Sequence, residues 1–189
     1  MSTTSENSLK NHFLISTPQL KGSTFGQSII YICEHSSGGT MGLKINHALN
    51  SNLGEMFQQL DIPCDTSSEF DAPILDGGPV NVQQGFILHN SKQIWENSLN
   101  ITDSIQVTTS KDILYSIASR QFKGDYLVVL GYSGWSPNQL EDELKENSWM
   151  TLPATEEIIF SPNKQQIWPH CVKQLGFDFS QLSATTGNA

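Results

Sequence analysis

Residues 131–149 constrain the fold more than any other stretch of this chain. An apolar run at 126–130 leads into a glycine-flanked aromatic turn, and the signals for a helix start follow at once. Ser136 suits the N-cap, Pro137 suits the first helical position, and Gln139 completes a Ser-x-x-Gln capping box. This order predicts a strand that turns sharply into a helix, at a corner where a ligand can reach free backbone N–H groups.

Apolar periodicity predicts the other elements as short strands and helices in irregular alternation. We expect strands at residues 12–16, 27–35, 40–46, 85–89, 105–109 and 126–132, with later ones at Leu152 and 158–160. We expect helices at 53–60, after Ser110, after Ser136 and near the C-terminus, where Ser161 resembles a helix start and Pro169 begins or kinks the helix. The second and third strands flank Ser-Ser-Gly-Gly and form a hairpin. This order predicts an α+β fold with a mixed, largely antiparallel sheet surrounded by helices, and not a doubly wound parallel one.

The length of 189 residues fits one domain, or one domain with a smaller lobe. We expect that domain to cover residues 11–182, between a flexible N-terminus at 1–10 and a flexible tail at 183–189. No apolar run is long enough to span a bilayer, and the polar first residues lack the pattern of a signal peptide. The sequence therefore predicts a cytoplasmic protein without a membrane partner.

The charge and the cysteines bear on partners and cofactors. The formal net charge is −9, and the 10 Lys and Arg residues are scattered along the chain. Because binding to a phosphate backbone needs several cations on one face, direct nucleic-acid binding is disfavoured. The 3 cysteines lie far apart without a Cys-x-x-Cys pair, which predicts reduced thiols, no disulfide and no metal site. We expect no cofactor.

Cys33, His35 and His89 are the residues whose chemistry would suit catalysis. Cys33 and His35 lie two apart on a predicted strand and are expected on one face, where they would suit a thiolate–imidazole pair or two metal ligands. His89 ends a strand, and histidine titrates near neutral pH. Neither candidate has a further partner at motif spacing. We therefore favour an inert buried thiol and a hydrogen-bonded structural histidine over catalysis.

Glycine-flanked turns supply the other candidates. The Asp-Gly-Gly-Pro turn with Gly77 and Gly78 forms either a ligand cradle or, as we favour, a tight turn, because it lacks the lysine of a P-loop. Ser133 falls one residue short of a Gly-x-Ser-x-Gly nucleophile elbow. Tyr132 and Trp135 either stack a planar ligand at the helix start or pack the helix onto the sheet.

Short ordered motifs run through most of the chain. They are Asn11-His12-Phe13-Leu14-Ile15, Ser28-Ile29-Ile30-Tyr31-Ile32-Cys33-Glu34-His35, Met41-Gly42-Leu43, Ile45-Asn46, Leu53-Gly54-Glu55, Gly77-Gly78-Pro79-Val80, Gly85-Phe86-Ile87-Leu88-His89, Gly131-Tyr132-Ser133-Gly134-Trp135, Gln139-Leu140-Glu141 and Asn147-Ser148-Trp149. In this order they resemble the bacterial YqgE/AlgH family, over nearly everything from residue 11 to residue 189.

The resemblance implies a compact mixed fold around a bifurcated sheet, in a cytosolic protein that has no established enzymatic activity and is labelled a transcriptional regulator. The chain departs from the family pattern Gly-Leu-Val-Ile-Asn-Lys-Pro, with Lys44 in place of the valine, His47 in place of the lysine and Ala48 in place of the proline. A charged Lys44 implies that its face of the strand is not fully buried. The exchange to His47 weighs against an anion site that uses the family's lysine.

These observations favour a non-enzymatic binding or regulatory protein over an enzyme. The residues expected to form its ligand or partner cleft are Asn46, Gly77, Gly78, His89, Tyr132 and Trp135. Any effect on transcription would be indirect, through a protein partner or a small molecule. The alternative is a hydrolase-type enzyme that acts on a small anionic metabolite through His89 or the Cys33/His35 pair.

Overall fold

The computed structural model describes residues 8–64 and 70–177. The predicted tail at 183–189 and all but the last three residues of the predicted flexible N-terminus lie outside the described residues. The strands are β1 (His12–Ser16), β2 (Ile29–Ser36), β3 (Gly39–Lys44), β4 (Ala48–Asn52), β5 (Pro73–Asp76), β6 (Val80–His89), β7 (Ser98–Asn100), β8 (Gln106–Thr108), β9 (Tyr126–Trp135) and β10 (Trp149–Pro153). The helices are a short 3-10 turn η1 (Pro18–Leu20), then α1 (Leu53–Gln59), α2 (Asp112–Ala118), α3 (Gln139–Lys145), α4 (Glu156–Ile159) and α5 (Lys164–Gln174).

The strands form one curled sheet in the order β10-β1-β2-β3-β9-β6-β8-β7, with β4 joined through β5. Neighbours pair antiparallel except β5 and β9, which pair parallel. The predicted hairpin is confirmed, because β2 pairs with β3 across the Ser-Ser-Gly-Gly turn. The predicted α+β class with a largely antiparallel sheet is confirmed as well.

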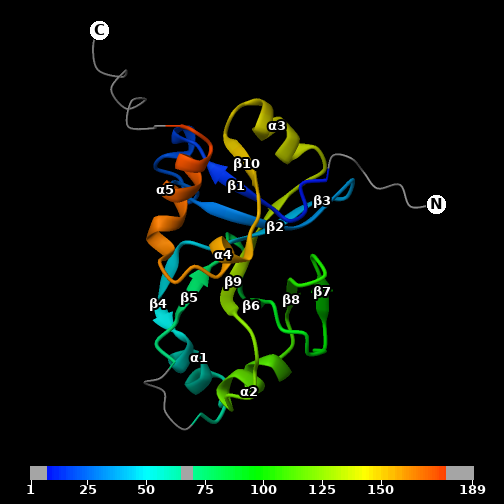
Figure 1. Cartoon of the computed structure of the whole chain (residues 1–189), viewed down its shortest axis with the longest axis vertical. Helices are drawn as coiled ribbons and strands as arrows, with labels where there is room; N and C mark the ends of the chain where they lie inside the picture. Colours follow the sequence, from blue (N-terminus) through cyan, green and yellow to red (C-terminus); the bar gives the residue numbers. More distant parts are fainter. Residues whose placement is uncertain (1–7, 65–69, 178–189) are drawn as a thin grey trace, which may run out of the picture.

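The long strand β9 is where the sheet divides in two. One edge of β9 pairs with β5 near its start, at Val129 and Leu130, and with β3 at its end, from Ser133 to Trp135. The opposite edge pairs with β6. Figure 1 shows β9 running from the end of the molecule that holds α1 and α2 toward the end that holds α3. The sheet is therefore bifurcated, as the family resemblance implies.

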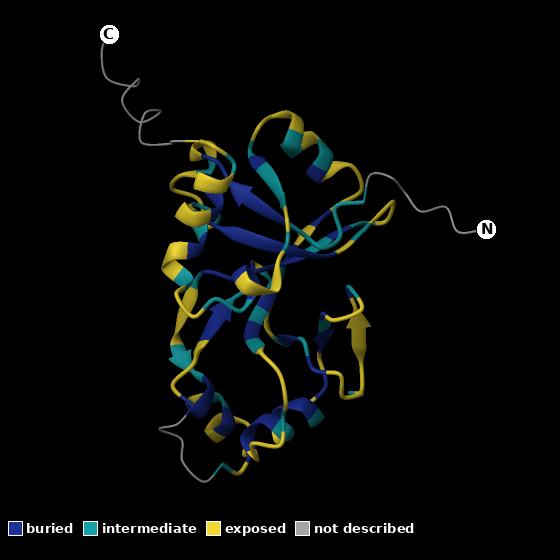
Figure 2. Cartoon of the chain, viewed as in Figure 1, coloured by how far each residue is buried: buried dark blue, intermediate teal, exposed yellow. Residues whose placement is uncertain are grey.

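Three apolar clusters fill the spaces around the two branches. The main core holds alternate residues of β1, β2 and β3 and is closed by Ile158 and Ile159 of α4 and Ile167 of α5. A second cluster lies under α1 and α2, and a third lies between β1, β2 and α3. Figure 2 shows β1 and most of β2 buried, whereas β7 is exposed. Within the described residues no helix is long and apolar enough to cross a membrane.

The helix after β9 begins two residues later than predicted, at Gln139 in place of Pro137. Strand β9 continues through Trp135, which pairs with Thr40, so the chain needs residues 136–138 to turn before a helix can start. Asn138 makes that turn in the left-handed conformation, with φ at 65°. Half of the predicted capping box is present, because the Gln139 side chain accepts a hydrogen bond from Ser136 N at 3.0 Å. The Ser136 side chain is not the cap.

Near the C-terminus, the predicted strand at 158–160 and the predicted helix start at Pro169 are also wrong. Residues 158–160 are not a strand, because Thr155 caps a short helix there by accepting a hydrogen bond from Ile158 N at 3.4 Å. Helix α5 begins at Lys164 and passes through Pro169, which neither starts it nor ends it. The helix tolerates this proline because Gln165, whose carbonyl loses its partner, is exposed to solvent.

Candidate functional site

Lys44 is buried, contrary to the expectation that its face of the strand is open. Only 1% of its side chain is exposed. Its Nζ donates to Asp76 Oδ2 at 2.7 Å and to the Thr24 carbonyl at 3.1 Å, and it lies 5.7 Å from the centre of the Phe25 ring. A buried lysine is tolerated here because a carboxylate and a carbonyl replace the water that it loses.

Gly77 and Gly78 form a turn that packs against β9 and does not open toward a ligand. A Cβ atom on Gly77 would collide with the Gly131 carbonyl and the Val129 side chain. Gly78 has a φ of 143°, and a Cβ there would collide with the backbone of Tyr132. The Gly77 carbonyl accepts hydrogen bonds from Lys44 N at 3.0 Å and from Ser133 Oγ at 3.0 Å. The glycines are needed for close backbone contact.

Ser133 and Asn46 are both held by backbone partners. Ser133 is 1% exposed, and its hydroxyl donates a hydrogen bond to the Gly77 carbonyl. Asn46 follows β3 and is 8% exposed. Its Oδ1 accepts from Ile29 N at 2.8 Å, and its Nδ2 donates to the Gln27 carbonyl at 2.8 Å. Asn46 therefore fixes the entry to β2.

His89 lies fully buried at the end of β6. Its Nδ1 accepts from Ser91 N at 3.2 Å, so the proton sits on Nε2 and is donated to Thr108 Oγ1 at 2.9 Å. Burial lowers the pKa of His89 to about 4, which keeps the imidazole neutral at physiological pH. The Phe122 ring packs at 90° to the imidazole, with 5.9 Å between ring centres. Both ring nitrogens are used inside the fold.

Cys33 and His35 do not share a face, contrary to the prediction from their spacing. The pairing of β2 with β3 skips Cys33, because Ile32 faces Gly42 and Glu34 faces Met41. This β-bulge reverses the alternation. Cys33 lies in the main core, where burial raises the pKa of its thiol. His35 lies on the other face, where its Nε2 donates to Glu141 Oε1 of α3 at 2.9 Å and its Nδ1 accepts from Leu9 N at 2.8 Å.

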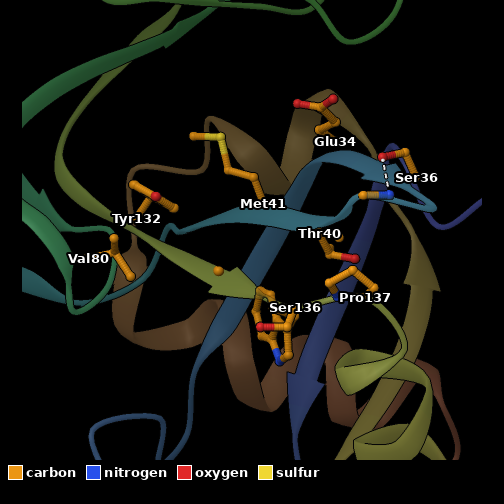
Figure 3. A pocket seen from close by; sticks show the side chains of 12 residues that line it. Glu34, Ser36, Thr40, Met41, Val80, Tyr132, Ser136 and Pro137 are labelled. Atoms are coloured by element: carbon orange, nitrogen blue, oxygen red, sulfur yellow. Dashed lines mark hydrogen bonds between the residues drawn. The ribbon is translucent and has the colours of Figure 1, made fainter.

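Tyr132 and Trp135 are the two predicted site residues that line a surface hollow. This outer hollow has a volume of about 580 Å³. Its lining residues are Glu34, Ser36, Gly38, Gly39, Thr40, Met41, Val80, Tyr132, Gly134, Trp135, Ser136 and Pro137. Figure 3 shows Tyr132 and Val80 at one side of the hollow and Ser36 and Thr40 at the other. Asn46, Gly77, Gly78 and His89 are not among its lining residues.

The outer hollow is built on a row of residues across three strands. Glu34 of β2 faces Met41 of β3, and Met41 faces Gly134 of β9. Glu34 and Gly134 are exposed, and Met41 is partly buried. Tyr132 stands two residues before Gly134 on the same face, with its ring packed edge-on against Phe86 at 5.8 Å between centres. Gly134 has no side chain, so its backbone stays exposed and the Tyr132 ring can lie close to it, 3.2 Å from where a Cβ would be.

Sequence reasoning missed Glu34, Met41 and Gly134 as lining residues. The bulge at Cys33 is what brings Glu34 onto the same face as Met41, and the apolar run before it carries no sign of that change. Gly134 was noticed only as part of the turn, because the predicted strand ended at residue 132, whereas β9 runs through Trp135 and makes Gly134 a strand glycine.

No group of three or more His, Cys, Asp or Glu side chains is arranged to hold a metal ion within residues 8–64 and 70–177. Across the same residues, the acid–base candidates Cys33, His35 and His89 occupy three separate places in the fold. The outer hollow therefore offers hydroxyls, apolar side chains and the carboxylate of Glu34, and not a paired acid and base.

Comparisons with known proteins agree with this architecture. A family model described as AlgH-like matches residues 13–180. A UPF0301 protein of Vibrio parahaemolyticus is 46% identical over 185 residues, covering 96% of this chain and 99% of that protein. A UPF0301 protein of Shewanella baltica is 44% identical, covering 96% and 99%.

Solved structures give the same result for the fold. The solution structure of the AlgH protein from Pseudomonas aeruginosa matches with a TM-score of 0.79 and 36% identity, and the match covers 100% of each chain. The crystal structure of a Corynebacterium diphtheriae protein matches with a TM-score of 0.68 at 19% identity, over 89% of this chain and 87% of that one, and shares the fold alone. The chain belongs to the AlgH-like family.

Proposed function

We propose that this protein is a non-catalytic binding protein that takes a small molecule or a segment of a partner protein into the outer hollow. The observation that carries the proposal is the row Glu34, Met41 and Gly134, which stays open beside the ring of Tyr132. Strand residues at the centre of a sheet are normally covered. An uncovered row with a glycine in it lets another group approach the backbone closely.

The lining favours a neutral or positively charged occupant. Glu34 is the charged residue among the twelve that line the hollow, and the hydroxyls of Ser36, Thr40 and Ser136 supply donors and acceptors. A volume of about 580 Å³ lies within the range of small-molecule sites. An anionic metabolite, the substrate of the hydrolase alternative, would face the Glu34 carboxylate without a lysine or arginine from the lining.

The placement of the titratable side chains supports binding without catalysis. His89 is 0% exposed and does not line the hollow, and Cys33 is buried in the main core. A hydrolase needs a base or nucleophile within reach of its substrate, and these two candidates are out of reach. We therefore base no second function on them.

As part of this proposal, the protein acts in the cytoplasm and affects transcription only indirectly. A net charge of −9 opposes contact with a phosphate backbone, so an effect on transcription would pass through the bound ligand or through a protein partner. Occupation of the hollow would change the surface next to α3, because Ser136 and Pro137 lead directly into that helix.

A thermal-shift screen of metabolites, peptides and duplex DNA tests the proposal, since a ligand of the native state raises the melting temperature. Gly134→Val fills the floor of the hollow at an exposed strand position, where the new Cβ lies 3.2 Å from the Tyr132 ring and shifts that ring slightly. Gly85→Val is the matched control, because a Cβ there meets nothing within 4 Å. We expect hits that stabilise wild type and Gly85→Val but not Gly134→Val. Equal stabilisation of all three proteins would place binding elsewhere, and a hit with DNA alone would reject the indirect route.

A further inference from the structure

A second hollow lies on the other side of Trp135, between α3 and the loop before β2. Its volume is about 310 Å³, and Gly134 and Trp135 line it as well as the outer hollow. We call it the indole hollow. Its lining residues are Leu20, Phe25, Pro79, Gly134, Trp135, Gln139, Glu143, Ser148 and Trp149.

Three aromatic rings from separate segments meet in the indole hollow at steep angles. The rings of Trp135 and Trp149 lie 6.0 Å apart between centres with 80° between their planes. Phe25 lies 5.6 Å from Trp149 with 72° between their planes. Rings at these distances are in direct edge-to-face contact, and Trp135 and Trp149 are 6% and 3% exposed, so an occupant of the hollow meets the outer surface of an aromatic cluster.

The carboxylate of Glu143 fixes both indoles. Its Oε2 accepts from Trp135 Nε1 at 2.9 Å and from Trp149 Nε1 at 2.8 Å. Its Oε1 accepts from Gln139 Nε2 at 3.0 Å. Both oxygens therefore already receive N–H donors, and their negative charge remains beside the rings. This arrangement attracts a cation but leaves little capacity for further strong donors.

In the described part of the chain, the Glu143 carboxylate is not paired with a cationic side chain. Glu141 and Asp142 of α3 are paired with His35 and Lys145, each at 2.9 Å, and Glu146 follows the helix. Lys44 stands near Phe25, but Asp76 pairs with its ammonium at 2.7 Å. The hollow is thus an aromatic space with a net negative charge.

We infer that the indole hollow binds a small quaternary ammonium compound of about the size of choline. The methyl groups of such a cation pack against aromatic rings, and its diffuse charge is attracted by them and by a nearby carboxylate. It carries no N–H, so it needs no free acceptor on Glu143. A primary ammonium is strongly hydrated and would require acceptors that the indoles and Gln139 already occupy.

This site shares Gly134 and Trp135 with the outer hollow but does not rest on the function proposed there, and the two proposals fail separately. Titration with choline chloride, followed by NMR of the tryptophan Nε1–H signals, tests it. We expect the Nε1–H signals of Trp135 and Trp149 to shift. The backbone amide signals of Glu34 and Met41 should stay unchanged. The uncharged analogue 3,3-dimethylbutan-1-ol, which has the same shape, is expected to bind at least about tenfold more weakly. Sodium chloride at the same concentration corrects for ionic strength.

Two variants separate the charge from the rings. Glu143→Gln keeps an oxygen for the indole N–H groups but removes the charge, and we expect a loss of about tenfold in choline affinity. Phe25→Leu keeps an apolar side chain but removes a ring, with an expected loss of about fivefold. Glu146→Gln, at the residue that follows α3 and outside the lining, is the control and should bind as wild type does.

The inference is overturned by any of three results. They are no saturable shift of Trp135 and Trp149 with choline, equal binding of the uncharged analogue, or full affinity in both Glu143→Gln and Phe25→Leu. Thermal unfolding of each variant establishes that it is folded at the titration temperature. If Glu143→Gln is unfolded there, Phe25→Leu and the comparison of the two ligands still decide the outcome.

Discussion

Lys44 and Asp76 form an ion pair at 2.7 Å in which the lysine side chain is 1% exposed and the aspartate side chain 38%. The pair joins the end of β3 to the end of β5, two strands that do not pair with each other. Asp76 also accepts a hydrogen bond from Gly78 N at 3.1 Å, so it holds the glycine turn against β9. The two branches of the sheet are thus linked by one charged contact.

Removing the two partners of this pair should have unequal effects. Asp76→Asn leaves the Lys44 ammonium buried without its counter-charge and should lower the free energy of unfolding by about 3 kcal/mol. Lys44→Met leaves a carboxylate that water can reach, and its cost should stay under about 1 kcal/mol. Urea denaturation measures both. Asp142→Asn breaks the exposed pair with Lys145 and should cost less than about 0.5 kcal/mol. Equal costs for Asp76→Asn and Lys44→Met would contradict this explanation.

Gly77 should be intolerant of any side chain although its φ is not in the left-handed region. Gly77→Ala places a Cβ against the Gly131 carbonyl and should cost about 3 kcal/mol through overpacking. Gly85→Ala, where the same atom meets nothing within 4 Å, should change the free energy of unfolding by less than about 0.5 kcal/mol. The two variants are compared by urea denaturation. A small cost at Gly77 would mean that the turn and β9 can move apart.

The buried His89 should make stability depend on pH in a defined window. Burial lowers its pKa to about 4 in the folded protein, against about 6.5 in the unfolded chain. Its contribution to stability is therefore fully present above pH 6.5 and is lost as the pH falls toward 4. The loss over that window should be about 3 kcal/mol.

The variant His89→Gln isolates this effect from the other titrating groups. The difference in free energy of unfolding between wild type and the variant should shrink as the pH falls from about 7 to 4, because only wild type has an imidazole to protonate on unfolding. Denaturation curves at several pH values measure it. A constant difference, or an imidazole that titrates near pH 6.5 by NMR in the folded protein, would show that His89 is accessible.

The thiols should divide into one reactive and two protected groups. Cys33 and Cys171 are each 0% exposed, and burial raises the pKa of Cys171 to about 11 and that of Cys33 above its usual value. Cys64 is partly exposed. An aromatic disulfide reagent should modify Cys64 rapidly and the other two at the rate of unfolding. Rapid modification of Cys33 would show that its thiol is accessible and would contradict its place in the main core.

Local patterns carried most of the strand and helix assignment. The predicted strand at residues 12–16 matches β1 in both bounds, and the Ser-Ser-Gly-Gly turn located the hairpin. The apolar run Ile158-Ile159-Phe160 misled because a run of this length fits a strand or a short buried helix equally well. There the deciding contact is the cap from Thr155.

The candidate site was harder to predict from the sequence, because it depends on contacts between segments that lie far apart in the chain. Lys44 is buried because of a partner 32 residues away. Trp135 and Trp149 both donate hydrogen bonds to Glu143, which requires α3 to fold back against the two strands that hold them. Among the six predicted site residues, Tyr132 and Trp135 lie at the outer hollow, whereas Asn46, Gly77, Gly78 and His89 have partners inside the fold.

The most direct test of binding at the outer hollow is a backbone NMR titration of wild type and Gly134→Val with a ligand from the thermal-shift screen. The proposal predicts saturable shifts confined to residues 34–41, 80 and 132–137 in wild type, loss of those shifts in Gly134→Val, and the same ligand recovered unchanged after prolonged incubation. Shifts that persist in Gly134→Val, or conversion of the ligand into a product, would contradict it.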